Sequence, residues 1–251
     1  MENGIIKPVI RVGNSAGVLL PKSWVNGKAK IELVTRPLNI KRDVLEILDS
    51  NLEQISGIYL TGSYARKEED EESDIDILAL TKNENKKIIK GKYNILLISI
   101  ASLEKAIDGN ALPLIPMLKE AKAIMNQGLL DKYKKSNLTK KNIRWYLETT
   151  TSAINLDENL MELSKEEDVI SDNLAYSLVL RLRGLYIIDS LNKNQVPNKK
   201  GLIRIIEKVS GSKKIYEGYL RSKKGEANRK NAPKKEAEKL LRYIKKRIKE
   251  I

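Results

Sequence analysis

The chain has 251 residues, a formal net charge of +14, 41% hydrophobic residues, and neither histidine nor cysteine. This length and apolar content predict a globular protein of two or more domains. The missing residue types exclude disulfides, thiolate nucleophiles, Ser-His-Asp triads and metal sites built on His or Cys. Any metal must therefore be bound by oxygen, which points to Mg²⁺, Mn²⁺ or Ca²⁺.

All of the excess positive charge lies in the C-terminal part of the chain. Residues 193–251 contain 20 Lys and Arg against 6 Asp and Glu, whereas residues 1–192 contain 27 of each. Such a segment attracts a polyanion such as RNA, DNA or a nucleotide, although a solvated lysine-rich helical surface explains the composition equally well. No signal peptide and no bilayer-spanning apolar run is recognisable, so we expect a cytoplasmic protein without membrane contact.

Residues 1–37 are expected to form a small β unit. Residues 9–12 alternate as in a strand, residues 13–17 have turn chemistry, residues 18–20 resume a strand, and residues 28–34 alternate again. A β unit of this size buries little apolar surface by itself. It therefore needs a partner chain or the rest of the protein.

Helices and strands alternate over residues 38–136. The apolar face of residues 43–55 predicts a helix. The other expected elements are strands at Ile58–Leu60, Ile75–Leu80 and Tyr93–Ile100, a helix that starts at Thr61-Gly62-Ser63, and helices at Ser102–Ile107 and Leu114–Asn126. This alternation predicts an α/β domain whose mixed sheet packs against helices.

Residues 137–251 are expected to be all helical. Thr139 caps a helix that runs to about Leu163, and Ser171 starts another that runs to Leu191. Shorter helices follow after Asn198, Ser212 and Pro233. The predicted fold class is thus α+β, with a small N-terminal β unit, an α/β domain and a C-terminal all-helical bundle.

The end of the strand at residues 58–60 has the chemistry of a phosphate site. Gly62 allows a tight turn and a close approach of the backbone, and the Ser63 hydroxyl adds a donor. The start of the following helix presents backbone N–H groups and a favourable dipole. Together these features fit a nucleoside triphosphate.

Asp74 and Asp76 are two residues apart on the next predicted strand, so their side chains point to the same face. Two carboxylates in this arrangement repel each other unless a divalent cation lies between them. Phosphoryl and nucleotidyl transfer require such a cation, usually Mg²⁺, to neutralise developing charge.

Gly62-Ser63, ten intervening residues and then Asp74-Ile75-Asp76 resemble the motif of the DNA polymerase β nucleotidyltransferase superfamily. With Gly-Ser-x-Ala-Arg, the segment at residues 43–135 most resembles the minimal nucleotidyltransferase branch. The resemblance implies that Asp74 and Asp76 are catalytic and ligate Mg²⁺ or Mn²⁺. It also implies the nucleotide- and phosphate-binding residues Gly62, Ser63, Arg66 and Ser73. A helix N-cap at Ser63, with exposed acids at a strand end, is the structural alternative.

The superfamily usually places a third carboxylate on a following strand. Here no Asp or Glu occurs between residues 85 and 103, and Asn94 takes the expected position. Either two carboxylates suffice with an acceptor activated otherwise, or nucleotide binding survives without transfer. Glu104 is one carboxylate that a folded chain could bring to this place.

The flanking segments resemble other families. Residues 5–34 are similar to the swapped-hairpin AbrB/MazE-like domain of regulators and antitoxins, which implies a homodimer and a DNA-binding face; a plain β appendage is the alternative. The matching residues are Arg11, Gly13-Asn14-Ser15, Val18 and Leu20-Pro21-Lys22. The helical region loosely resembles the bundles of kanamycin nucleotidyltransferase relatives and HEPN domains, but the absence of histidine excludes HEPN-type ribonuclease chemistry.

Polar-tipped residues of the helical region can face an acceptor or a base, or border the core. They are Arg181, Arg183, Tyr186, Tyr216 and Tyr219. The function that we expect is Mg²⁺-dependent transfer of an NMP from an NTP to an acceptor hydroxyl, on RNA or protein rather than on a small molecule. The alternative is a dimeric nucleic-acid-binding regulator or antitoxin whose transferase domain binds nucleotide but is catalytically impaired.

Overall fold

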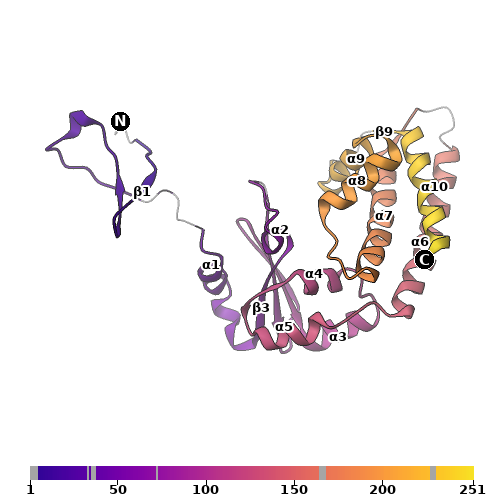
Figure 1. Ribbon diagram of the computed structural model, residues 1–251, viewed down its shortest axis with the longest axis horizontal. Coiled ribbons are helices and arrows are strands. Elements are labelled where there is room, and N and C mark those ends of the chain that lie inside the picture. Colours follow the sequence, from indigo (N-terminus) through magenta and orange to yellow (C-terminus); the bar gives the residue numbers. More distant parts are fainter. Residues whose placement is uncertain (1–4, 33, 35–37, 72, 164–167, 227–229) are drawn as a thin grey trace. The chain divides into compact units, whose positions relative to one another are not determined.

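The computed structural model describes residues 5–32, 34, 38–71, 73–163, 168–226 and 230–251. Contacts divide the chain into two compact units, residues 1–40 and residues 41–251. Figure 1 shows the course of the chain through each unit. None of the described helices has the length and apolarity needed to cross a membrane.

The first unit contains a β-hairpin, and none of the unit's described residues is buried. Strands β1 (Val9–Val12) and β2 (Ser15–Val18) pair antiparallel, and Gly13 takes a positive φ of 59° in the turn. A 3₁₀ helix, η1 (Lys22–Trp24), follows. Large apolar side chains of this unit are exposed: Ile5, Ile6, Val9, Ile10, Val12, Leu19, Leu20, Trp24, Val25, Ile31 and Val34.

The expected strand at residues 28–34 is wrong where the chain is described, because residues 28–32 and 34 have no strand conformation; Leu33 lies outside the described residues. An alternating pattern becomes a strand only where a neighbouring backbone satisfies its N–H and C=O groups.

The second unit is built on a five-stranded mixed sheet. Its strands are β3 (Ile55–Thr61), β4 (Ile75–Thr81), β5 (Lys86–Lys90), β6 (Tyr93–Ser99) and β7 (Lys122–Met125). They lie in the order β5-β6-β4-β3-β7, with β4 and β6 parallel and the other neighbours antiparallel. Because β4 and β6 are parallel neighbours, the first residues of both strands lie side by side at the same end of the sheet.

Short helices surround this sheet. They are α1 (Ile40–Ile47), the 3₁₀ helix η2 (Asp49–Gln54), α2 (Gly62–Arg66), α3 (Ile100–Asp108), α4 (Leu114–Glu120) and α5 (Gln127–Lys134). Helices α3, α4 and α5 cover one face through Leu103, Leu118 and Tyr133, which pack with Tyr59 and Leu78 of the sheet.

Two predicted helices are shorter than expected. The helix predicted over residues 43–55 ends at Ile47, because the chain tightens into η2 and residue 55 already pairs in β3. The helix predicted over residues 114–126 ends at Glu120, because residues 122–125 pair with the outer edge of β3. In both places ladder hydrogen bonds of the sheet override helical periodicity.

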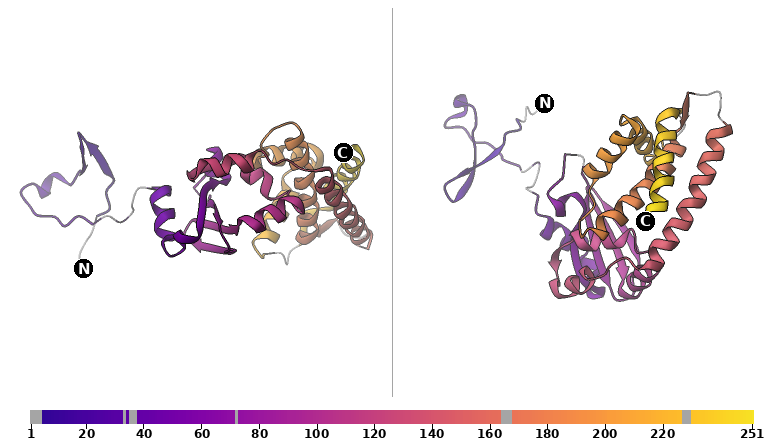
Figure 2. Two further views of the ribbon diagram at one scale, coloured as in Figure 1. Left: turned by 90° about the horizontal axis from the view of Figure 1, so that it is seen from below. Right: turned by 45° about the vertical axis from the view of Figure 1, so that its right-hand side comes forward.

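The C-terminal region consists mainly of long helices. They are α6 (Lys140–Leu163), α7 (Asp172–Asn192), α8 (Lys199–Ser210), α9 (Lys214–Lys223) and α10 (Lys234–Glu250). Ser171 and Asn198 cap α7 and α8 as predicted. Figure 2 shows α6, α7 and α10 side by side, in agreement with their contacts.

The expectation that residues 137–251 are all helical is wrong in one detail. Strands β8 (Val169–Ser171) and β9 (Lys230–Pro233) pair antiparallel into a small ribbon. Each strand has three or four residues, too few for a periodic signal. Ile170 and Ala232 bury their side chains in the core around α7.

Asn142 ties α6 to the sheet-containing region. Its Nδ2 lies 2.9 Å from the carbonyl oxygens of Asp108 and Gly109, and its Oδ1 accepts the Thr139 N–H at 2.9 Å. The side chain is 2% exposed. These carbonyls end α3, so one buried amide satisfies helix-terminal groups that would otherwise lack partners.

We predict that Asn142→Ala lowers the free energy of unfolding by about 2 kcal/mol, because buried carbonyl and N–H groups lose their partner. Asn155→Ala is the control, since Asn155 lies exposed on the same helix and its loss should change stability by less than about 0.5 kcal/mol. Urea unfolding curves of both variants measure the difference. Equal stabilities would contradict the role given to Asn142.

Candidate functional site

The start of β4 carries the predicted carboxylates. Asp76 is the second residue of β4, and exposed Asp74 lies just before the strand. Asn94 stands beside Asp76 in the parallel ladder, and its Nδ2 donates to Asp76 Oδ1 at 2.8 Å. The place next to Asp76 is therefore occupied by an amide that already donates to that carboxylate.

The Asp76 side chain lies in an environment that disfavours its charge. Burial raises the pKa of its carboxyl, the hydrogen bond from Asn94 opposes this, and the neighbouring charge of Asp74 raises the pKa further. A half-buried carboxylate next to a second one is the situation that a bound cation relieves.

Gly62 brings the turn after β3 against the same carboxylate. Thr61 and Asp76 are direct partners in the β3–β4 ladder, so the turn begins beside Asp76. Gly62 has a positive φ of 70°, and a Cβ atom at this residue would lie 2.5 Å from Asp76 Oδ2. No other residue type fits here without displacing the carboxylate. The two halves of the sequence motif thus meet directly.

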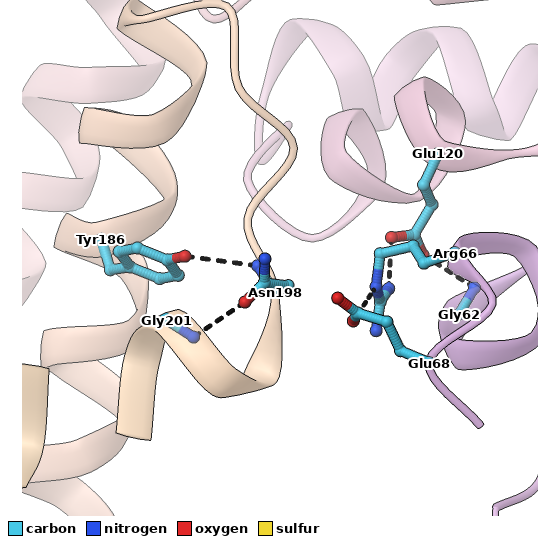
Figure 3. A network of polar contacts seen from close by, with 7 residues as sticks. All are labelled: Gly62, Arg66, Glu68, Glu120, Tyr186, Asn198 and Gly201. Carbon is cyan, nitrogen blue, oxygen red and sulfur yellow. Dashed lines mark hydrogen bonds and ion pairs between the residues drawn. The ribbon is translucent and has the colours of Figure 1, made fainter. Parts of the chain in front are cut away.

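Glu120, at the end of α4, holds the turn from another element. Its Oε1 accepts the Gly62 N–H at 2.8 Å, and its Oε2 accepts Arg66 Nη1. Arg66 Nε also donates to Glu68 at 2.9 Å. Figure 3 shows Arg66 between the two carboxylates, with Gly62 beside Glu120. Glu120 is 9% exposed, and burial raises the pKa of its carboxyl although the charge of Arg66 lowers it.

Sequence reasoning missed Glu120, because it lies 58 positions after Gly62 and ends a helix that has no recognisable motif. Glu104, considered for the missing carboxylate, is engaged elsewhere: it accepts from Lys132 and Tyr133 on α5. It lies on α3, which follows the end of β6, whereas Asn94 lies near the start of β6.

The other predicted site residues have local partners. Ser63 lies half-buried in the first turn of α2. Ser73 donates to Asp70 Oδ1 at 2.6 Å and accepts the Asp70 N–H at 2.9 Å, which shapes the loop before Asp74. The structure therefore brings Gly62, Ser63 and Arg66 together in α2, and Ser73 next to Asp74.

The helical region reaches this site. The charge of Lys223, at the end of α9, lowers the pKa of Asp76 against the larger effect of burial. Figure 3 shows Asn198, in the connection from α7 to α8, opposite Glu68 and Arg66. The Asn198 N–H points to the Tyr186 hydroxyl at 3.4 Å.

The other polar-tipped residues of the helical region belong mostly to its packing. Tyr216 and Tyr219 are buried in the core, and Tyr219 stacks on Tyr176 with ring centroids 5.2 Å apart. Arg183 is exposed, and buried Arg181 Nε has no hydrogen-bond partner among the described residues. Figure 3 shows Tyr186 beside Asn198, on the side of the site that faces Arg66 and Glu68.

Comparison with known proteins identifies the central region. Residues 41–144 match the family model described as the nucleotidyltransferase domain. This segment contains the whole five-stranded sheet, both carboxylates and the Gly62 turn. Residues 41–144 thus match a nucleotidyltransferase domain family whose members are generally enzymes.

Solved structures that the chain matches include a nucleotidyltransferase-like protein from Exiguobacterium sibiricum, with 12% identity, 84% of this chain and 75% of that chain covered, and a TM-score of 0.40. Spectinomycin adenyltransferase AAD(9) from Enterococcus faecialis, solved with ATP and spectinomycin, has 13% identity, 83% and 97% coverage, and a TM-score of 0.42. A toxin–antitoxin structure with AMP-PNP has 16% identity, 49% and 99% coverage, and a TM-score of 0.29. No curated protein matches the sequence.

We predict that Gly62→Ala destabilises the protein more than Gly91→Ala does. Both glycines have positive φ, 70° and 56°, so both variants lose about 1 kcal/mol to backbone strain. Only at Gly62 does the new methyl group meet Asp76, whereas the space around Gly91 is open. Thermal unfolding in the absence of nucleotide compares the two variants. Equal melting temperatures would show that Gly62 does not abut Asp76.

Proposed function

We propose that the protein transfers a nucleoside monophosphate from a nucleoside triphosphate to an oxygen of an acceptor and releases pyrophosphate. The observation that carries the proposal is the contact between the Gly62 turn and Asp76, within a segment that matches the nucleotidyltransferase domain. This contact joins a backbone suited to phosphates to a carboxylate suited to a cation.

The residues present fit Mg²⁺ or Mn²⁺. Asp74 and Asp76 supply oxygen ligands of the kind these cations prefer. Burial disfavours the negative charge of Asp76, and a bound cation would stabilise that charge. Among the described residues there is no group of three or more His, Cys, Asp and Glu side chains that could hold a metal alone. We therefore assign the remaining ligands to the triphosphate. The cation would supply charge neutralisation at the reacting phosphate.

The triphosphate is assigned to the Gly62 turn. Ser63 contributes its N–H and hydroxyl, and Ser73 contributes from the loop on the other side of Asp74. Arg66 lies one helical turn beyond Gly62 and assists near the phosphates, in an orientation that Glu68 and Glu120 hold. Glu120 accepts the Gly62 N–H, so this group orients the turn instead of binding phosphate.

The acceptor is assigned to the side of the site that faces the helical region. The charge of Lys223 lowers the pKa of Asp76 against the larger effect of burial. Residues 193–251 carry all of the net positive charge of the chain. A macromolecular acceptor, RNA or protein, agrees with this charge better than a cationic small molecule does. A hydroxyl acceptor of the kind expected from the sequence must lose its proton during transfer.

We further propose three domains, at residues 1–37, 38–136 and 137–251, and a homodimer held by the first of them. The described residues of this first domain include eleven exposed large apolar side chains and no buried residue. A second copy of the domain is therefore the partner that we assign to it. The same dimer supports the alternative function, a nucleic-acid-binding regulator or antitoxin that only senses nucleotide. DNA binding lost on removal of residues 1–34 would favour this alternative.

We predict that Mg²⁺ or Mn²⁺ together with a non-hydrolysable NTP raises the melting temperature of the wild type but not of Asp76→Asn. The variant keeps an acceptor for the Asn94 amide and loses only the charge that holds the cation. Asp49→Asn is the control, because Asp49 is exposed in η2, away from the β4 strand start. A shift of the same size in Asp76→Asn would argue against the metal assignment.

We also predict that the wild type transfers label from one of the four α-labelled NTPs to an acceptor, and that Asp74→Ala/Asp76→Ala reduces transfer at least about 100-fold. Candidate acceptors are RNA and protein incubated with the enzyme and Mg²⁺ or Mn²⁺. Nucleotide binding with no transfer to any acceptor, unchanged in the double variant, would refute the enzyme and favour the sensor.

A further inference from the structure

Asn94 occupies the position from which a side chain could act on an acceptor beside Asp76. Its amide nitrogen donates to Asp76 Oδ1 at 2.8 Å, so its donor side is fixed toward the carboxylate. An amide has no basic site near neutral pH and cannot take a proton from a hydroxyl. The group next to Asp76 is therefore unable to serve as a general base.

The other described groups near Asp76 are also engaged. Asp74 is assigned to the cation, and Lys223 and Arg66 are cations. The two oxygens of Glu120 accept from Gly62 and Arg66. Besides Asp74 and Glu120, the site has the carboxylate of Glu68, which accepts from Arg66 Nε at 2.9 Å. The sequence holds no histidine.

Tyr93, the neighbour of Asn94 on β6, cannot act as a base either. Its hydroxyl donates to Asp43 Oδ2 at 2.8 Å. Burial raises its pKa, and the hydrogen bond to Asp43 raises it further, so the phenol keeps its proton. A hydroxyl acceptor would lose the general-base contribution, which is roughly 10²–10⁴-fold in rate.

We infer that the acceptor oxygen is that of a phosphomonoester, such as the terminal phosphate of a nucleic-acid strand or a small phosphorylated molecule. The inference rests on the proposed nucleotidyl transfer and names its substrate class. A phosphomonoester has its second pKa near 6 and is already an anionic nucleophile at pH 7.5. No base is needed to create it.

The step balances without any proton transfer. An anionic oxygen of the phosphomonoester attacks the α-phosphorus of the NTP and forms a new P–O–P bond. The bond from the α-phosphorus to the oxygen that bridges it to the β-phosphorus breaks, and pyrophosphate leaves with that electron pair. The product is a phosphoanhydride that carries the NMP unit.

The surrounding charge suits a second phosphate group. Two phosphates that approach each other need cations between and around them. Lys223 is exposed, and its charge lowers the pKa of Asp76 against the larger effect of burial, whereas Arg221 is committed to a bidentate pair with Asp172 at 2.8 Å. Lys223 is therefore the residue of α9 that we assign to the acceptor phosphate.

The test compares one oligoribonucleotide in three forms: unphosphorylated, with a 5′-phosphate and with a 3′-phosphate. The full-length protein is incubated at pH 7.5 with each α-labelled NTP and Mg²⁺ or Mn²⁺, and ribose 5-phosphate and inorganic phosphate are tested in parallel. A pyrophosphatase that cleaves P–O–P bonds distinguishes the product types. It releases labelled NMP from a phosphoanhydride but not from a phosphodiester.

We expect at least about 100-fold more transfer to a phosphorylated acceptor than to the unphosphorylated oligonucleotide, with pyrophosphatase-sensitive label. Transfer to ribose 5-phosphate or inorganic phosphate alone would support the inference and identify a small acceptor. Equal or preferred transfer to hydroxyl ends would overturn the inference and leave the proposed function intact. No transfer to any acceptor would overturn both.

Asn94→Asp gives the converse test, because it restores a carboxylate beside Asp76. We expect this variant to gain transfer to the unphosphorylated oligonucleotide by at least about 10-fold. Asn155→Asp, which adds the same charge at an exposed residue of α6, should not.

Anisotropy of labelled oligonucleotides adds a binding readout: Lys223→Ala should weaken binding of the phosphorylated form only. Equal weakening of both forms would remove Lys223 from the acceptor site.

Discussion

The close approach of the Gly62 backbone to the Asp76 carboxylate is the contact on which the rest of the site depends. The β3–β4 ladder places Thr61 opposite Asp76, and the positive φ of Gly62 turns the chain into α2 at that point. A Cβ atom at residue 62 would lie 2.5 Å from Asp76 Oδ2, so only glycine allows this approach. The geometry thus explains why the glycine and the aspartate occur together although thirteen residues separate them.

A network of side chains with alternating charge surrounds this contact. Glu120 binds the Gly62 N–H and Arg66, Arg66 binds Glu68, and the charges of Arg66 and Lys223 act on Asp76. Each buried charge therefore has a neighbour of opposite sign, except that Asp76 also faces Asp74. These four carboxylates and two cations leave two negative charges unbalanced at the place where the proposed divalent cation binds, and the metal and nucleotide assignments follow from this imbalance.

The sequence was sufficient to predict elements whose signal is local. The Gly-Ser turn, the Asp-Ile-Asp strand and the caps at Ser171 and Asn198 depend on residues a few positions apart. The superfamily resemblance pointed to Asn94 as the residue in place of a third carboxylate, and the β4–β6 ladder pairs Asn94 with Asp76. The contact of Glu120 with Gly62 depends on how α4 packs against the sheet, and no local pattern encodes it. Strand β7 was predicted as helix because its pairing with β3 is likewise a tertiary effect.

The most direct measurement of the central claim is a crystal structure of the protein with Mn²⁺ and a non-hydrolysable NTP, with anomalous diffraction recorded at the manganese edge. The account predicts an anomalous peak within bonding distance of both Asp74 and Asp76, and phosphate oxygens at the Ser63 end of α2. A nucleotide bound elsewhere, or a cation that contacts neither carboxylate, would contradict it.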